Sequence, residues 1–178
     1  LPPAAAPAKG SLIMAETVSK VRIEVTITGK VIGDDGAELT IDESYVATFD
    51  DGTGTNQCGT VWQDRVRNLN TTSEDHDFAG SRTDFQGAAI AGTAMKFLYL
   101  RNLDSDSGDT LILKQGSANP MTTMLGGTNP TFTIPPNGIL LAVGPVDGWT
   151  LTGGSADTIA CQTADNSNYR AIIGLDNT

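Results

Sequence analysis

The stretch TFTIPPNGILLAVGPVDGWTLTGGSADTI, residues Thr131–Ile159, indicates the fold class most directly. It consists of short apolar runs separated by PPNG, GPVDG and TGGSAD, and such segments are typical of tight turns. The stretch contains no histidine, cysteine, lysine or arginine. It therefore predicts short strands joined by turns, and it supplies few side chains suited to catalysis or metal binding.

The same pattern continues towards the N-terminus. In KVRIEVTIT, the residues Val21, Ile23, Val25 and Ile27 alternate with polar residues, which predicts a half-buried strand. GDDG then offers a turn and the alternation resumes at LTI, so a hairpin is expected. TAMKFLYLRNL is apolar on both faces and predicts the central core strand.

The spacing of the strand candidates predicts the architecture. Roughly ten candidates recur at intervals of about 8–12 residues, which predicts an all-β fold, an antiparallel β-sandwich. A jelly-roll-like sandwich is the first choice, and an immunoglobulin-like sandwich or a barrel is the alternative. Residues 18–178 are expected to form this single domain. Residues 1–17, rich in proline and alanine, are expected to be an extended arm, either a flexible tail or a segment that orders on a neighbouring subunit.

Charge and composition limit the classes of partner. The 178 residues carry 21 acids and 11 bases, giving a net charge of -10, which disfavours nucleic acid and anionic membranes as partners. No apolar run approaches the ~18 residues of a membrane helix, and no secretory signal is visible. Cys58 and Cys161 are far apart in sequence and are interpreted as two free, half-buried thiols.

The sequence offers no evident catalytic centre. The single histidine, His76, stands among Glu74, Asp75 and Asp77, and we interpret it as a solvated loop histidine whose charge these carboxylates favour. A Ser–His–Asp arrangement would need a serine brought close in space, and no GxSxG elbow is present. We therefore expect no catalytic residues and no enzyme activity.

Other candidate sites are weak. DSDSGD offers Asp104, Asp106 and Asp109 as oxygen ligands for calcium, but the spacing does not follow an EF-hand loop, and a turn that caps its own backbone is the preferred interpretation. We expect no metal and no other cofactor. The aromatic residues available as sugar platforms are interpreted as core residues instead; they are Trp62, Trp149 and Tyr169.

Three segments carry a resemblance to a known family. VWQDRVRNLNTTSEDHDFAGSRTDFQGAAI and MKFLYLRNLDSDSGDTLIL resemble small structural proteins of tailed bacteriophages, and IPPNGILLAVGPVDGWTLTGGSADTI is similar to their closing region. The likeness covers roughly Cys58 to Leu175, and Val18 to Gly52 lies outside it. The positions that carry it are Trp62, Asp64, Arg65, Glu74, Asp75, Asp77, Lys96, Leu98, Tyr99, Asn102, Trp149 and Asp157.

The resemblance implies a virion structural protein. Our first hypothesis is a capsid decoration, or cement, protein: a homotrimer on the capsid surface that binds the major capsid protein and contacts neither nucleic acid nor membrane. The arm would contribute the binding residues Leu1, Pro2, Pro3, Leu12 and Ile13. The alternatives are a tail or fibre component that binds a host receptor, and a carbohydrate-binding module.

Overall fold

The computed structural model describes residues 20–32, 36–69, 73–83, 89–127, 129–163 and 167–176. The predicted arm residues Leu1, Pro2, Pro3, Leu12 and Ile13 lie outside these ranges. The elements in chain order are β1 (Val21–Ile32), β2 (Glu38–Phe49), β3 (Thr60–Leu69), β4 (Ser73–Asp77), β5 (Ala79–Thr83), β6 (Ala89–Ala91), β7 (Ala94–Asn102), β8 (Leu111–Gln115), α1 (Thr122–Leu125), β9 (Thr131–Ile134), β10 (Ile139–Val143), β11 (Trp149–Thr150), β12 (Thr158–Thr163) and β13 (Ser167–Leu175).

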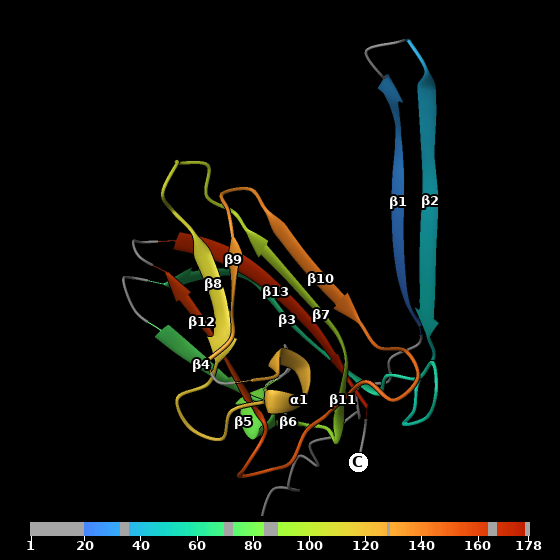
Figure 1. Cartoon of the computed structure of the whole chain (residues 1–178). Coiled ribbons are helices and arrows are strands. Elements are labelled where there is room, and N and C mark those ends of the chain that lie inside the picture. The colour runs from blue at the N-terminus through green and yellow to red at the C-terminus, as the bar shows by residue number, and fades with distance from the viewer. Residues whose placement is uncertain are drawn as a thin grey trace, which may run out of the picture.

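Two antiparallel sheets form the body of the molecule (Figure 1). The five-stranded sheet has the order β10–β7–β13–β3, with β11 also paired to β7, and the four-stranded sheet has the order β4–β12–β8–β9. The predicted all-β antiparallel sandwich is confirmed. In the described part of the chain, α1 is the one helix, and its four residues are too few to cross a membrane.

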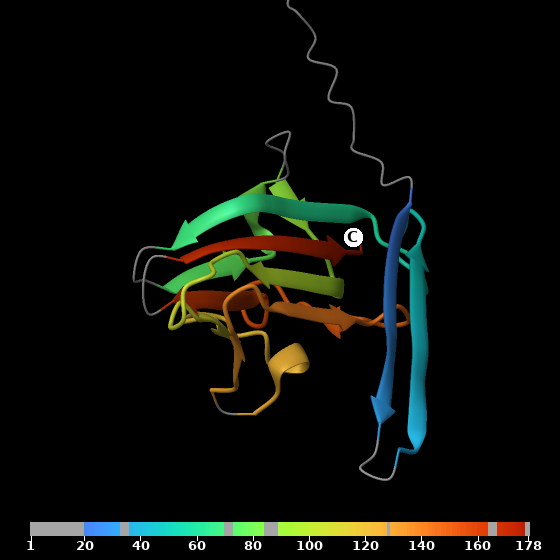
Figure 2. The same ribbon diagram turned by 90° about the horizontal axis from the view of Figure 1, so that it is seen from above.

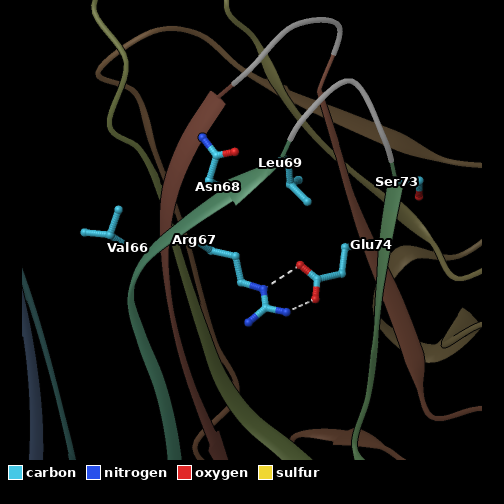
Figure 3. A pocket seen from close by; sticks show the side chains of 6 residues that line it. All are labelled: Val66, Arg67, Asn68, Leu69, Ser73 and Glu74. Carbon is cyan, nitrogen blue, oxygen red and sulfur yellow. Dashed lines mark hydrogen bonds and ion pairs between the residues drawn. The ribbon is translucent and has the colours of Figure 1, made fainter.

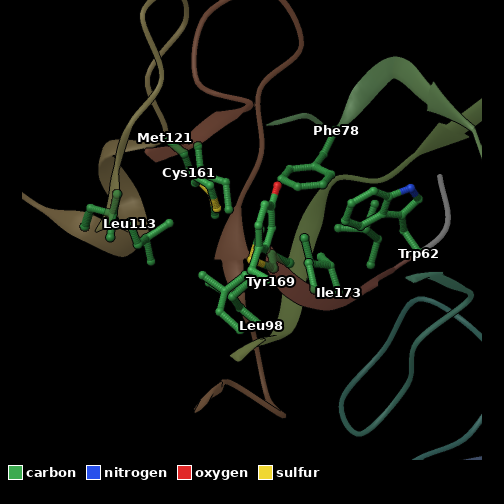
Figure 4. Packing of buried hydrophobic residues seen from close by; sticks show 14 of the residues in the cluster. Trp62, Phe78, Leu98, Leu113, Met121, Cys161, Tyr169 and Ile173 are labelled. Atoms are coloured by element: carbon green, nitrogen blue, oxygen red, sulfur yellow. The ribbon is translucent and has the colours of Figure 1, made fainter. Parts of the chain in front are cut away.

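The main core lies between these two sheets and contains residues of both (Figure 4). Strand β7 pairs with β13 on one side and with β10 and β11 on the other, so the prediction of a central strand is confirmed. In β13, Tyr169, Ala171 and Ile173 point into the core and are fully buried, while Arg170 and Ile172 between them face outwards and are half-buried. This period of two is the expected pattern for a strand with one buried face.

Strands β1 and β2 form a long hairpin that stands away from the sandwich (Figures 1 and 2). The predicted hairpin is confirmed, but the predicted half-burial of its apolar face is confirmed only for part of β1. Val21, Ile23 and Val25 are half-buried, whereas Ile27 is 58% exposed, because the hairpin continues beyond the part that packs on the body. Two strands of 12 residues span about 40 Å.

Both cysteines are free thiols, as predicted, but they are fully buried rather than half-buried. Cys161 belongs to the main core. Cys58 belongs to a second, smaller cluster with Ala47, Phe49 and Phe97, which lies between the base of the hairpin and the outer face of the five-stranded sheet. Half-burial is wrong for Cys161 because its side chain belongs to the core between the sheets, and for Cys58 because the base of the hairpin covers the outer face.

Candidate functional site

The interpretation of His76 as a solvated loop residue is wrong. The polar run Ser73–Asp77 is strand β4, paired to β12, and His76 is only 1% exposed. Its ring is stacked against the ring of Phe78, and its centroid lies 5.3 Å from that of the Trp62 ring. Alternation explains the burial, because His76 and Glu74 take positions on the same face of the strand.

His76 belongs to a chain of polar contacts that joins the two sheets. Its Nε2 lies 2.7 Å from the Tyr169 hydroxyl, and that hydroxyl lies 3.5 Å from Glu74 Oε2. Arg67 Nε donates to Glu74 at 2.5 Å, and a terminal nitrogen of Arg67 donates to the other Glu74 oxygen (Figure 3). The remaining terminal nitrogen of Arg67 donates to the Asp64 carboxylate at 3.0 Å. We call these five residues the polar clamp; they come from β3, β4 and β13.

The electrostatics of the polar clamp favour a structural role. Burial raises the pKa of Tyr169 far above its usual value, and the Cys161 and Glu74 charges add to that shift. The bond to Glu74 raises the pKa of Arg67, which keeps its guanidinium charged. A neutral Tyr169 phenol and a charged Arg67 guanidinium keep these contacts in place near neutral pH. The clamp therefore links strands of both sheets.

An open hollow of about 470 Å³ lies beside the clamp (Figure 3). It is lined by Arg67 and Glu74, together with neighbours on β3 and β4. The guanidinium in it is already held by two carboxylates, so an incoming anion would have to displace Glu74 or Asp64. This hollow is therefore a poor anion site.

The acidic turn after β7 is hydrogen-bonded to strand β13. The Asp104 carboxylate accepts a hydrogen bond from the Asn168 backbone N–H at 2.6 Å, and Asn102 Nδ2 donates to the Asp109 carbonyl at 2.7 Å. A turn forms as predicted, with the Asp109 N–H donating to the Asp106 carbonyl at 3.2 Å, but the Asp104 carboxylate bonds to β13 instead of capping its own turn. Among the described residues, no group of three or more histidine, cysteine, aspartate or glutamate side chains could hold a metal ion.

The three candidate sugar-platform residues lie in or against the core. Trp62 and Tyr169 are buried, as predicted. Trp149 is half-buried and packs against the main core. Trp62 and Tyr169 therefore present no open ring face of the kind that a sugar-binding platform needs.

The outer face of the five-stranded sheet offers a different kind of site. Strand register places three rows of side chains across it, in the order β10, β7, β13. The rows are Val143–Phe97–Gly174, then Leu141–Tyr99–Ile172, then Ile139–Arg101–Arg170. The base of the hairpin covers the first row, and the second row lines a groove of about 320 Å³ beside the hairpin.

The third row places two cations side by side. Arg101 and Arg170 are direct cross-strand partners, a pairing that is unfavourable for like charges without an anion nearby. Neither forms an ion pair within the described ranges, and Arg101 Nε is buried with no hydrogen-bond partner among these residues. The sequence alone does not reveal this pair, because only the cross-strand register brings the two arginines together.

The hairpin has one apolar and one polar face. Odd-numbered β1 residues and their partners form the apolar face, and the polar face carries the ion pairs Arg22–Glu24 and Lys30–Glu38. Ile32 and Val46 are apolar exceptions on the polar face. We call the outer part of the apolar face the ribbon face; it consists of Ile27, Gly29, Val31, Leu39, Ile41, Glu43 and Tyr45.

Comparison with known proteins adds no relative to these observations. No family model matches the chain, and neither a curated protein nor a solved structure matches it.

Proposed function

We propose that this chain is a virion structural protein that acts by contact, a capsid decoration protein that binds and stabilises the outer shell. One contrast carries the proposal. In the described part of the chain, the side chains of His76, Tyr169 and Arg67 form hydrogen bonds with other residues of the sandwich. The ribbon face and the Arg101–Arg170 pair lie on outer surfaces instead. Such a distribution suits a protein that works through its surface.

We also propose that the sandwich is a jelly roll. In chain order the eight main strands are β3, β4, β7, β8, β9, β10, β12 and β13. Numbered one to eight, they give sheet orders 1-8-3-6 and 2-7-4-5. Every consecutive connection except the fourth-to-fifth therefore passes from one sheet to the other, which supports a double-sheet Greek-key arrangement.

The proposed partner is the major capsid protein, and the proposed location is the capsid surface. The net charge of -10 suits an outer coat that faces solvent and is repelled by packaged nucleic acid. The arm residues Leu1, Pro2, Pro3, Leu12 and Ile13 would extend over the shell and add backbone and apolar contacts.

The number of copies per particle tests this proposal. Quantitative mass spectrometry of purified virions should give a copy number on the scale of the shell lattice. A handful of copies per particle would instead indicate the tail or fibre alternative, and absence from particles would reject a virion role. Glycan binding by the isolated chain would favour the carbohydrate-binding alternative.

Reconstitution tests the role of the arm. Shells stripped of the chain are mixed with the full chain and with a chain that lacks residues 1–13. We expect lower occupancy for the shortened chain at equal concentration. Equal occupancy would remove the arm from the binding mechanism without affecting the assignment to the shell.

A further inference from the structure

The ribbon face is an apolar surface without a cover in the described structure. Val31 and Leu39 are 51% and 65% exposed and face each other across the hairpin, and Ile27 and Tyr45 are also exposed. A two-stranded hairpin alone is only marginally stable in water, and it needs packing on one face. The outer half of this hairpin therefore lacks the packing that its base has.

Charge on the ribbon face is limited to a single acid. Glu43 lies opposite Ile27 and is exposed, and it forms no ion pair with any described residue. Its neighbour Asp42 lies opposite Thr28 on the other, polar face. An incoming surface that fits the ribbon face must therefore be apolar and must offer a cation to Glu43.

The outer face of the five-stranded sheet has this composition. Leu141, Tyr99 and Ile172 form an apolar row, and the next row holds Arg101 and Arg170. The base of the hairpin already makes this type of contact within the chain, since Phe49 packs on Phe97 in the neighbouring row. The outer part of the hairpin and the groove at the second row are thus continuous with an existing contact and match it chemically.

We propose that the ribbon face of one copy docks on the outer sheet face of a second copy of this chain. Its apolar residues cover Leu141, Tyr99 and Ile172, and Glu43 binds the Arg101–Arg170 pair. The contact is heterologous, because two different surfaces meet in it, and a closed ring of copies uses every such surface. The proposal goes beyond capsid binding and does not depend on it.

A second copy fits better than an unrelated partner. The chain as a whole carries a charge of -10, so two copies repel each other. A contact that offsets this repulsion must be low in acids and must pair each acid with a cation. The ribbon face and the sheet face meet both conditions. The base of the chain's own hairpin borders the second row, where Val21 and Ile23 line the same groove as Tyr99, so the hairpin of another copy would enter this groove beside them and reach the third row.

Sedimentation equilibrium of the full chain, with charge-reversal variants, tests the proposal. The wild-type chain should self-associate, and Glu43→Arg should raise the dissociation constant by about tenfold or more, because it places like charges together. Asp42→Arg makes the same change of charge on the polar face and should leave self-association nearly unchanged. Circular dichroism confirms that each variant folds.

A rescue experiment identifies the receiving surface. Arg101→Glu with Arg170→Glu should also weaken self-association, and combining them with Glu43→Arg should restore it. The proposal is overturned if the wild-type chain is monomeric at every concentration, if Asp42→Arg acts as strongly as Glu43→Arg, or if the combined variant is not rescued. A monomer that still decorates particles would leave the capsid assignment intact.

Cross-linking shows whether the contact forms between copies. A chain with Ile41→Cys is mixed with a chain with Tyr99→Cys, and disulfide-linked dimers should form on oxidation. Thr40→Cys, one residue away on the polar face, is the matched control and should give far less product. Equal yields from Ile41→Cys and Thr40→Cys would contradict the proposed orientation.

Discussion

Phe49 at the end of β2 packs against Phe97 of β7, with ring centroids 5.4 Å apart and planes tilted by 43°. This contact joins the hairpin to the sandwich. Both rings are buried, together with Ala47 and Cys58, so the cluster acts as an apolar anchor for a ribbon that is otherwise mostly exposed. Loss of this anchor should release the hairpin while the two-sheet body stays folded.

Phe49→Ala tests the anchor. Removing a buried phenylalanine side chain costs about 3–5 kcal/mol where the surroundings cannot collapse, and here the cost falls on the hairpin. We expect hydrogen exchange of β1 and β2 amides to speed up strongly, with little change in β7 and β13. Phe132→Ala, at a ring that is 48% exposed, is the control. Uniform acceleration across all strands would mean that the hairpin and the body unfold as one unit.

Tyr169→Phe tests the polar clamp. The substitution keeps the ring in the core but removes the hydroxyl that lies 2.7 Å from His76 Nε2. A buried group that loses its partner costs about 1–3 kcal/mol, so the free energy of unfolding should fall by that amount. Tyr45→Phe removes the same group from an exposed ring and should be neutral. Chemical denaturation of the two variants measures the difference, and equal stabilities would show that the contact between Tyr169 and His76 adds nothing.

Gly174→Ala tests the close packing on the outer sheet face. Gly174 pairs with Phe97, and an added Cβ would lie 2.1 Å from Phe97 Cε1. The ring is buried under the hairpin, so it cannot move aside freely, and overpacking of this kind costs about 1–3 kcal/mol. Gly29→Ala has no heavy atom within 4 Å of the new Cβ and is the control. Thermal melts should show a lower midpoint for Gly174→Ala alone.

The sequence predicted the type of fold well because its signal is local. Alternation from Val21 and the apolar run around Leu98 indicate strands without reference to the rest of the chain. The prediction for His76 is wrong because acidic neighbours do not by themselves indicate a solvated loop. Those neighbours in fact alternate between the two faces of β4, and the burial of the histidine depends on Tyr169, which is 93 residues away along the chain.

The candidate surfaces depended even more on long-range pairing. Arg101 and Arg170 become neighbours only through the register of β7 with β13, which the sequence does not state. Likewise, the sequence predicts the hairpin but not where it leaves the body, so the exposure of Ile27 was missed. The arm residues stay a prediction, since they lie outside the described ranges.

The Cys58 thiol should make stability depend on alkaline pH. Burial raises its pKa from 9.0 to about 11. Because the folded thiol holds its proton more tightly than the unfolded one, its contribution is fully present below the unfolded pKa, and it is lost as pH rises through the folded pKa. The contribution is on the order of 2–3 kcal/mol for a shift of this size.

Comparison of the wild-type chain with Cys58→Ala isolates this effect. Tyr169 and other groups titrate in both proteins, so their effects cancel in the difference between the two unfolding free energies. The advantage of the wild-type chain over Cys58→Ala should shrink as the pH rises from about 8 to about 11. Alkylation of the native thiol should also stay slow until the pH nears the folded pKa, since the thiolate is the reactive form. Parallel stability curves together with fast alkylation near pH 8 would show that Cys58 is not held protonated by burial under the hairpin.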